Sequence, residues 1–428
     1  MTTLPTQPRR HPIRLVVADD LERSRLTVFF RLLLALPHLV WVTLFGIAAS
    51  FVALAAWLAV LIERRVPTSL HDFLARYVRY TTHLAAYLSF AASPYPRFGG
   101  RSPYPVDVEV HPPDAQGRFG ALFRLVLLLP ASFVAWSLGG SAVLGLWFGF
   151  AALTILGGLT STVAVLAWFA CLARGRMPRG MRDAAAYGCG YGAQVTAYAL
   201  MVTARYPDSA PDRLAGDAEL PPHPVAIDLR DDLGRPRLLV LFRLPLVVPH
   251  LLWLTLWSVF VTAAVLLGWL AALVLGRLPR VLHRFMAAFV RTTAHVVAFL
   301  YVVGRPFPGF LGREGTYPVD VTIAPPERQR RLGVLLRPVL AIPALLLSSA
   351  YGSILFVVAV LAWLMALVLG RVPDGLRDLG VSALRYQTQI TAYVLLLTSR
   401  YPDSSPVLVG RPEAPPAPEP EPEPEPVA

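Results

Sequence analysis

Long runs of the chain carry no charged residue, and they constrain the fold more than any other feature. Two of them extend over residues 32–62 and 125–173. A helix needs about 20 apolar residues to cross the hydrocarbon core of a bilayer, so both runs are longer than a soluble core requires. Only 15% of all residues are charged, whereas soluble domains average about 25%. These runs indicate an integral membrane protein.

The prolines mark a four-fold internal repeat. In the first, third and fourth copies, four prolines are separated by 25, 30 and 29 residues. In the second copy the first and last intervals are again 25 and 29 residues, but the middle interval is 48 residues in place of 30. The second copy therefore contains an insertion of 18 residues. Such a fixed period predicts four copies of one structural unit. The four sets are Pro12, Pro37, Pro67 and Pro96; Pro105, Pro130, Pro178 and Pro207; Pro224, Pro249, Pro279 and Pro308; and Pro318, Pro343, Pro373 and Pro402.

Each unit follows the same order of segments. A short stretch of alternating polar and apolar residues predicts a β-strand outside the bilayer. A long apolar helix follows, then a tight Arg-x-Pro loop, and then a second, more polar helix that begins at the proline. We therefore expect an all-α polytopic membrane protein with short extramembrane β-strands, built from four tandem two-helix units.

The units alternate between two types. Units one and three share a Pro-His pair in the long helix, whereas units two and four share Tyr-Pro-Val-Asp-Val and Arg-Tyr-Pro-Asp-Ser. This A-B-A′-B′ order indicates that an ancestral two-unit half was duplicated. The expected segments are residues 1–96 (unit A), 97–207 (unit B with the insertion), 208–223 (linker between the halves), 224–308 (unit A′), 309–409 (unit B′) and 410–428 (a disordered Pro/Glu tail).

Two helices in each unit predict eight membrane spans with both termini on the same side. The N-terminal segment and the long connectors hold more arginines than the short loops, which favours a plasma-membrane protein with cytoplasmic termini. The polar start of the chain shows no cleavable signal peptide. Two questions stay open. The first is whether the insertion, about residues 132–165, forms an extra span or instead a re-entrant or broken helix. The second is whether the second helices cross the membrane or lie along it.

Polar residues recur on one face of the second helix. Sixteen residues after its first proline stands His or Gln, and most units carry Arg four residues before it and Tyr four residues after it. Such groups are costly at membrane depth and face protein or water. This polar stripe consists of Arg79, His83, Tyr87, Gln194, Tyr198, Arg291, His295, Arg385, Gln389 and Tyr393.

Two interpretations of the polar stripe are open. Its four copies could converge near a pseudo-symmetry axis and form a polar path or an anionic-ligand site, with His83 and His295 as titratable members. Alternatively, the His and Gln side chains supply hydrogen bonds between helices, while the arginines reach toward lipid headgroups.

Arginine and tryptophan keep fixed places in every unit. We expect the arginines to anchor to headgroups and the tryptophans to form an aromatic belt or a packing anchor. We also expect His38 and His250 to be polar caps at the interface, and Asp107 and Asp320 to point outward from the strands. The arginines are Arg31, Arg65, Arg124, Arg176, Arg243, Arg277, Arg337 and Arg371. The tryptophans are Trp57, Trp168, Trp269 and Trp363.

No motif for a metal, a nucleotide or a catalytic triad occurs in the chain, so we expect no cofactor, no metal site and no catalytic residue. The net charge of +12 comes from arginine alone. No basic run is interleaved with aromatic residues, which argues against nucleic acid as a partner. The expected partners are a lipid bilayer with anionic headgroups and, through the tail, a cytoplasmic protein.

Three segments carry a resemblance to a known family. They are "FRLPLVVPHLLWL" (residues 242–254), "LAWLMALVLGRVPDGLRDL" (361–379) and "TAYVLLLTSRYPDS" (391–404). With these motifs the chain resembles the actinobacterial membrane-protein family defined by domain of unknown function 4389, over residues 12–406. The resemblance implies a membrane location and supplies no catalytic residue. The insertion in unit B departs from the family pattern.

These patterns favour an integral membrane protein that has no enzymatic activity and that organises the membrane or binds a partner or lipid. One alternative is a transporter or channel with a polar path between the duplicated halves. A membrane enzyme is the less favoured alternative, because no acid–base pair or metal cluster has the spacing that chemistry requires.

Overall fold

A computed structural model describes residues 11–101, 103–139, 158–211 and 223–406. These residues are mostly helical, with a few short strands. Each unit contributes one strand, one helix of five residues and one helix of 21 residues, which we call the second helix. Three units also contribute one long apolar helix, and unit B contributes two shorter apolar helices in its place. The expected fold class is confirmed: repeated two-helix units with short β-strands, and helices long and apolar enough to cross a membrane.

The elements recur in the same order in all four units. The strands are β1 (Ile13–Val17), β2 (Val106–Val110), β3 (Val225–Leu229) and β4 (Val319–Ile323). The five-residue helices are α1 (Arg25–Phe29), α4 (Arg118–Leu122), α9 (Arg237–Leu241) and α12 (Arg331–Leu335). The long helices are α2 (Arg31–Glu63), α10 (Arg243–Leu275) and α13 (Arg337–Leu369), with α5 (Arg124–Leu138) and α7 (Gly158–Arg174) in unit B. The second helices are α3 (Thr68–Leu88), α8 (Arg179–Ala199), α11 (Arg280–Leu300) and α14 (Asp374–Val394).

Local sequence sets the ends of these helices. Every second helix begins directly after a proline, whose fixed φ and missing N–H suit the first turn. The long helices end where the backbone turns left-handed, at Gly276 (φ 68°) and Gly370 (φ 71°), a conformation that glycine adopts at little cost. The prolines at the starts are Pro67, Pro178, Pro279 and Pro373.

Three of the long helices meet the requirements for a membrane span. α2, α10 and α13 are each 33 residues long and strongly apolar, whereas α5 and α7 are shorter apolar helices. Among the described residues, the more polar second helices are not candidates. The eight spans expected from the sequence are therefore not confirmed.

The two units of each half are bound together by their main chains. β1 pairs with β2 and β3 with β4, both antiparallel and each over five residues. The Arg-x-Pro loops add to this pairing. Arg23 N–H donates to the Gly175 carbonyl (2.9 Å), and Gln116 N–H donates to the Arg64 carbonyl (2.8 Å). Each half is thus one intertwined pair of units.

The two units of a pair run in opposite directions. The loop after α2 lies beside the segment that precedes α4, and the loop after α7 lies beside the segment that precedes α1. The two Arg-x-Pro loops of a half therefore lie at opposite ends of its helices. Because β2 connects the end of α3 to the start of α4, it carries the chain along the helices from one end of the half to the other.

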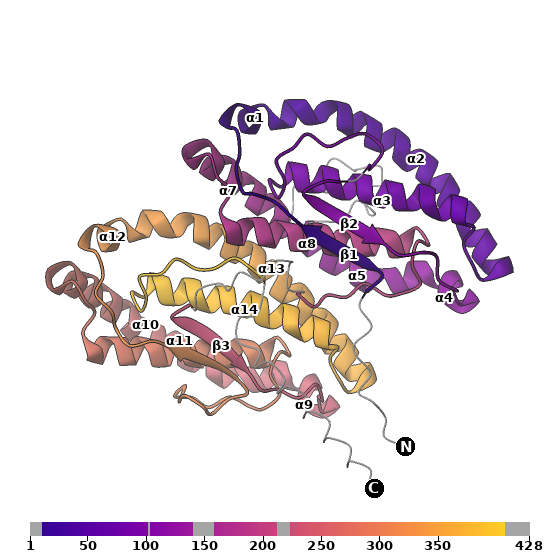
Figure 1. Cartoon of the computed structure of the whole chain (residues 1–428). Helices are drawn as coiled ribbons and strands as arrows, with labels where there is room; N and C mark the ends of the chain where they lie inside the picture. Colours follow the sequence, from indigo (N-terminus) through magenta and orange to yellow (C-terminus); the bar gives the residue numbers. More distant parts are fainter. Residues whose placement is uncertain (1–10, 102, 140–157, 212–222, 407–428) are drawn as a thin grey trace, which may run out of the picture.

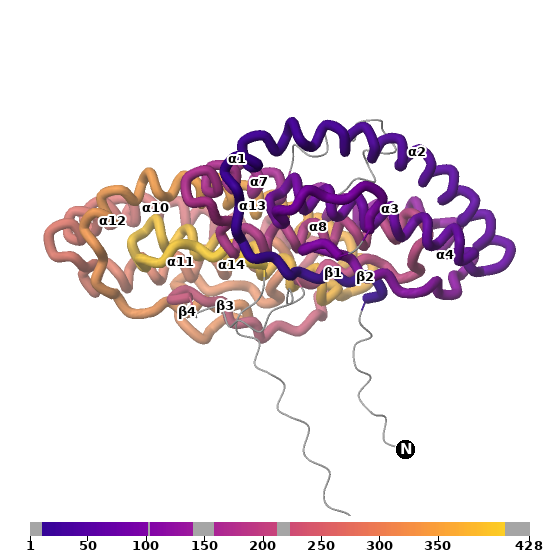
Figure 2. Tube along the Cα trace, turned by 45° about the horizontal axis from the view of Figure 1, so that its top comes forward, coloured from indigo at the N-terminus to yellow at the C-terminus, as the bar shows by residue number. Residues whose placement is uncertain are grey.

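The elements lie in layers (Figures 1 and 2). In the first half α2 is outermost, α3 packs against it, and the β1–β2 pair lies on the other side of α3. α3 also packs on α8, and α11 packs on α14. The halves meet where α13 contacts both α5 and α7. The second helices are therefore enclosed between the long helices and the strands.

The insertion in unit B interrupts the long helix without redirecting it. Thr160 Oγ1 at the start of α7 donates to the Leu138 carbonyl at the end of α5 (2.9 Å). Both helices pack on α8 and on α13, so together they take the place of one long helix. Whether the insertion is an extra span or a re-entrant helix depends on residues 140–157, which lie outside the described residues.

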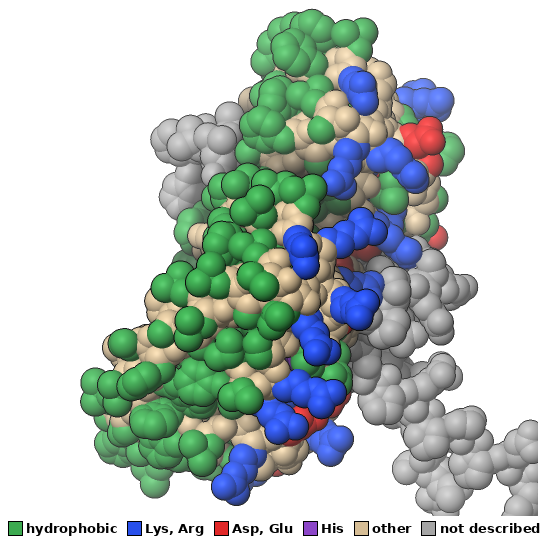
Figure 3. Space-filling model, turned by 90° about the vertical axis from the view of Figure 1, so that its left-hand side faces the viewer, with side chains coloured by type: hydrophobic (Ala, Val, Ile, Leu, Met, Phe, Trp, Pro, Cys, Tyr) green, Lys and Arg blue, Asp and Glu red, His purple; other side chains and the backbone are tan. Residues whose placement is uncertain are grey.

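Hydrophobic side chains cover the outer surface of the long helices. In α2, large apolar side chains are exposed from Leu32 (77%) to Ile62 (72%). Small residues such as Ala49 and Ala56 lie on the buried face of α2. Figure 3 shows hydrophobic side chains over one side of the molecule and a band of arginines beside them. Apolar surface of this extent marks a contact with lipid or with another protein.

Candidate functional site

In unit A the polar stripe contacts the strand pair. His83 Nε2 lies 2.7 Å from Asp107 Oδ1 on β2, and the His83 ring stacks on Tyr104 with centroids 4.5 Å apart. Arg79 Nε donates to the Val108 carbonyl (3.2 Å) and lies 3.3 Å from the Asp107 carboxylate. This His–Asp–Arg cluster joins α3 to β2.

Unit A′ repeats the cluster with deeper burial. His295 Nε2 lies 2.8 Å from Asp320 Oδ1, and Arg291 Nε donates to the Val321 carbonyl (2.9 Å). The ring of His295 stacks on Tyr317 with centroids 4.7 Å apart. The Asp320 side chain is 10% exposed, against 17% for its counterpart Asp107 in unit A.

In units B and B′ a glutamine takes the place of the histidine. Gln194 Nε2 donates to the Ile13 carbonyl on β1 (3.3 Å), and its Oε1 accepts the Asp208 N–H (2.9 Å). Gln389 makes the same two contacts, with the Val225 carbonyl (3.1 Å) and the Asp403 N–H (2.9 Å). Each glutamine holds the strand of the partner unit and the Tyr-Pro-Asp segment that follows its own helix.

The arginine position of the stripe differs between these two units. Arg385 is buried and donates to the Ser405 carbonyl. Gly190 takes its place in unit B, where a Cβ would lie 3.3 Å from the Leu15 side chain. The missing side chain in unit B thus makes room for the strand.

The polar stripe faces the strands and does not converge on one axis. The His and Gln of the first half engage the β1–β2 pair, and those of the second half engage the β3–β4 pair. The outward direction expected for Asp107 and Asp320 is wrong, because both carboxylates point to a second helix and hold its histidine. Neither aspartate was assigned to the stripe from the sequence, although each follows its histidine by 24 or 25 residues.

The tyrosine of the stripe contacts one of the arginines assigned to headgroups. Arg31 is 1% exposed, donates to the Tyr87 carbonyl (2.9 Å) and holds its guanidinium 4.3 Å from the Tyr87 ring. The last carbonyls of a helix lack partners and carry partial negative charge, so the arginine caps the second helix. The same contact recurs in Arg124–Tyr198 (2.7 Å), Arg243–Phe299 (2.5 Å) and Arg337–Tyr393 (2.8 Å).

The headgroup role expected for these four arginines is therefore wrong. Arg31, Arg124, Arg243 and Arg337 are between 1% and 4% exposed. The other four arginines of the set are exposed in the Arg-x-Pro loops, where a contact with headgroups is open to them. They are Arg65, Arg176, Arg277 and Arg371.

The four tryptophans join the units of each half. In three units the indole N–H donates to a carbonyl in the five-residue helix of the partner unit: Trp57 to Ala121 (3.0 Å), Trp269 to Val334 (3.1 Å) and Trp363 to Val240 (3.1 Å). In the fourth, the Trp168 ring lies 6.5 Å from that of Phe29 on α1. These contacts favour the packing anchor over the aromatic belt.

His38 and His250 are buried and are not caps at the interface. His38 Nδ1 lies 2.7 Å from the Tyr80 hydroxyl oxygen on α3. His250 Nε2 donates to the Pro308 carbonyl (2.9 Å), and its ring stacks on Phe310 at 4.2 Å. Both histidines join a long helix to its own second helix or to the loop after it.

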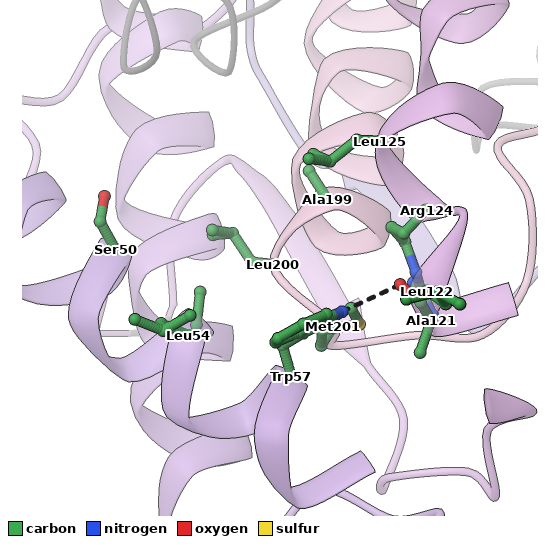
Figure 4. Close-up of a pocket in the computed structure, with 11 residues that line it drawn as sticks. Ser50, Leu54, Trp57, Ala121, Leu122, Arg124, Leu125, Ala199, Leu200 and Met201 are labelled. Carbon is green, nitrogen blue, oxygen red and sulfur yellow. Dashed lines mark hydrogen bonds between the residues drawn. The ribbon is translucent and has the colours of Figure 1, made fainter. Parts of the chain in front are cut away.

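A cavity of about 530 Å³ lies between α2 and unit B. Figure 4 shows Trp57 and Leu54 on one side of it and Leu122 and Leu125 on the other. Its lining is mostly apolar, and Leu54, Leu122 and Leu125 also belong to the exposed apolar surface. Such a cavity suits an apolar chain. Within the described residues, no three His, Cys, Asp or Glu side chains are arranged to hold a metal ion.

Acidification is expected to weaken the cluster in unit A′. Burial lowers the pKa of His295, and the hydrogen bond to Asp320 opposes this shift. The folded state therefore favours the neutral ring, and the stability present above the ordinary value of about 6.5 is lost as the pH falls below it. We expect the free energy of unfolding in detergent to decrease over this range. The variant His295→Gln carries the residue that units B and B′ have at this position, and its stability should decrease less as the pH falls. If the pH profile of this variant equalled that of the wild type, His295 would not be the cause of the decrease.

Three of the four buried arginine contacts, Arg31–Tyr87, Arg243–Phe299 and Arg337–Tyr393, lie in segments that a known family shares. The model of the family described as domain of unknown function (DUF4389) matches residues 25–99, 237–309 and 331–404. Together these segments make up more than half of the chain. The chain belongs to the DUF4389 family. No curated protein and no solved structure matches it.

The matched DUF4389 segments coincide with one part of the repeat. Each begins at the first residue of a five-residue helix and extends past the end of a second helix. Each therefore contains both partners of a buried contact such as Arg31–Tyr87. The strands lie outside the matched segments. The DUF4389 unit is thus the capped helix pair, and the strands join two such units into a half.

Proposed function

We propose that this DUF4389 protein is a non-enzymatic membrane protein that binds lipid. The observation that carries the proposal is the apolar outer surface of the long helices. In the most apolar stretches of α2, α10 and α13, only 22% to 39% of the residues are buried inside the protein. Each Å² of apolar surface left in water costs about 25 cal/mol, and a lipid phase removes this cost.

The exposed arginines support anionic headgroups as the partner. The Arg-x-Pro loops follow the apolar helices directly, so that Ile62 (72% exposed) is three residues from the exposed Arg65. A basic residue near an anionic surface contributes about 1 kcal/mol of binding free energy. The loops therefore offer positive charge where the apolar surface ends.

The cavity beside α2 supports a contact with individual lipid molecules. Its walls are mostly apolar, and several of its lining residues face the exterior among the other exposed leucines of the surface. A lipid tail that enters this cavity would keep the surroundings that it has in the bilayer.

A transporter has less support. The His and Gln side chains that would line a polar path are engaged in hydrogen bonds with strands, in two separate clusters in each half. The strand contacts give these side chains a structural role that needs no substrate.

We further propose that the protein lies in the plasma membrane with its strands and termini on the cytoplasmic side. The arginines of the N-terminal segment, the connectors and the loops support this orientation, because the cytoplasmic leaflet carries the anionic lipids. The tail at residues 410–428, which lies outside the described residues, is proposed to bind a cytoplasmic protein.

Vesicle flotation tests the proposal. Purified protein reconstituted with vesicles of equal parts phosphatidylcholine and phosphatidylglycerol is expected to float with the lipid and to resist extraction by salt or carbonate. The variant Leu33→Glu/Leu44→Glu/Leu58→Glu places three carboxylates on the exposed face of α2. Because each costs about 2 kcal/mol or more in lipid, the floating fraction should fall about tenfold or more.

A matched control carries the same three new charges elsewhere. Ala18 and Thr322 are exposed on or beside the strands, and Pro112 is exposed two residues after β2, so glutamates at these positions should leave flotation unchanged. Wild-type protein that stays in the aqueous fraction without detergent would contradict the proposed function.

A further inference from the structure

The direction of the helices relative to the strands indicates how the apolar surface meets lipid. Each long helix runs antiparallel to its second helix, and the two helix axes are nearly aligned. The contacts between them show this, because a contact recurs after seven residues forward in the long helix and seven residues backward in the second helix. The contacting pairs along α2 and α3 are Arg31–Tyr87, His38–Tyr80 and Phe45–Phe73. The pairs Arg243–Phe299 and Trp257–Phe285 show the same register in α10 and α11.

The strands run in this direction as well. Ile13 contacts Gln194 of α8, and Leu15 faces Gly190. Two residues along a strand cover about 6.6 Å, and four residues along a helix cover about 6 Å, so β1 follows the axis of α8. Long helices, second helices and strands therefore share one direction, and the strands lie beside the helices rather than beyond their ends.

The outer face of the strands is charged and open to water. Arg14 of β1 and Glu109 of β2 are opposite each other in the register, and both are exposed. Asp228 of β3 is exposed in the other half. If the long helices crossed a bilayer, these strands would lie at the depth of the hydrocarbon core. Charged groups and open sheet edges in contact with lipid are excluded there.

The apolar surface is also too long for a crossing orientation. From Leu32 to Ile62 it extends over 31 residues of α2, which is about 45 Å of helix, whereas the hydrocarbon core is about 30 Å thick. The five-residue helices extend the apolar surface beyond the long helices. Leu26 is 70% exposed and Phe119 is 81% exposed, at opposite ends of the first half. In Figure 3 the hydrophobic side chains gather along one side of the molecule, and the arginines lie beside them.

We propose that the long helices lie in the plane of the membrane, inserted into one leaflet of an anionic bilayer, with the strands in water on the same side. This inference rests on the proposed function, since the same apolar surface meets the lipid. Amphipathic helices bind membranes in this way, with a basic border at the headgroups. The in-plane orientation also explains why the Arg-x-Pro loops at opposite ends of a half carry the same exposed arginine, because both loops then lie at the headgroups.

Depth measurements along α2 test the orientation. Single cysteines at Leu33, Leu44 and Leu58, all on the exposed face, carry a spin label in vesicles of phosphatidylcholine and phosphatidylglycerol. Both native cysteines are buried, and Cys171→Ala/Cys189→Ala provides the background. Helices in the plane give one depth for all three labels. A crossing helix gives depths that change over the 25 residues from Leu33 to Leu58, a distance of about 37 Å.

Sidedness provides a second, independent measurement. Ser69 follows the Arg-x-Pro loop of unit A, Ala18 lies beside the C-terminal end of α3, and Glu109 lies on the strand face; all three are exposed. In the proposed orientation, single cysteines at these positions react with an impermeant maleimide from the same side of the membrane. We expect reaction in inverted vesicles and protection in intact cells.

The outcomes separate this inference from the proposed function. Floating protein with a depth gradient along α2, or with Ser69→Cys and Ala18→Cys on opposite sides, overturns the in-plane orientation and leaves lipid binding intact. Protein that does not float, including an oligomer in which a second copy covers the apolar surface, overturns both. Uniform depth together with one-sided labelling is the result that supports the proposal.

Discussion

Replacing Arg337 with alanine is expected to lower the free energy of unfolding by about 4 kcal/mol. The guanidinium is 4% exposed and donates to the carbonyls of Tyr393 (2.8 Å) and Thr398 (3.1 Å) and to Gln329 Oε1 (2.9 Å). It also lies 4.5 Å from the centroid of the Tyr393 ring. Alanine would leave three buried acceptors without this donor and would remove the positive charge at the end of α14. Chemical unfolding in detergent micelles measures the loss.

Two further variants isolate the cause. Arg337→Lys keeps the charge but not the planar group that reaches several acceptors and stacks on a ring, so it should remain clearly destabilised. Arg371→Ala removes an exposed arginine of the same unit and should change the free energy of unfolding by less than about 0.5 kcal/mol. If Arg337→Ala unfolded like wild type, the contact with α14 would not be what stabilises the unit.

The repeat and its helices could be predicted because the signals are local. A proline at the start of a helix and an apolar run act within a few residues, and Pro67 or Pro279 therefore marks the start of a second helix in the structure. The strands were also expected from their alternating residues. What these local signals do not contain is the partner of each strand, and the pairing of unit A with unit B came only from the structure.

The buried arginines show why the candidate site was harder to predict. In the sequence, an arginine next to an apolar run has the same pattern whether its side chain contacts a lipid headgroup or a carbonyl inside the protein. The distinguishing signal is a spacing: Arg31 and Tyr87 are 56 residues apart, as are Arg337 and Tyr393. In unit B the spacing is 74 residues, which is longer by the 18 inserted residues. A constant spacing between two conspicuous residue types would have indicated a contact.

Replacing Asp320 with alanine is expected to lower the free energy of unfolding by about 3 kcal/mol. Its carboxylate accepts hydrogen bonds from His295 Nε2 and from the backbone N–H groups of Val321 and Gly315, and it lies 3.8 Å from Arg291 Nε. Without it, buried donors lose their acceptor, and among the described residues Arg291 keeps only the exposed Glu314 as a charged partner. Chemical unfolding in detergent at neutral pH measures the effect.

The duplicated cluster supplies the control for this prediction. Asp107 holds His83 at a similar distance (2.7 Å), but its side chain is more exposed, at 17% against 10%, and so is its arginine, at 26% against 10%. Because water replaces lost contacts more readily where the groups are exposed, Asp107→Ala should cost only about 1 kcal/mol. Equal losses at the two positions would contradict burial as the cause. A double-mutant cycle of Asp320→Ala with His295→Gln should show coupling, since both changes remove the same helix–strand contact.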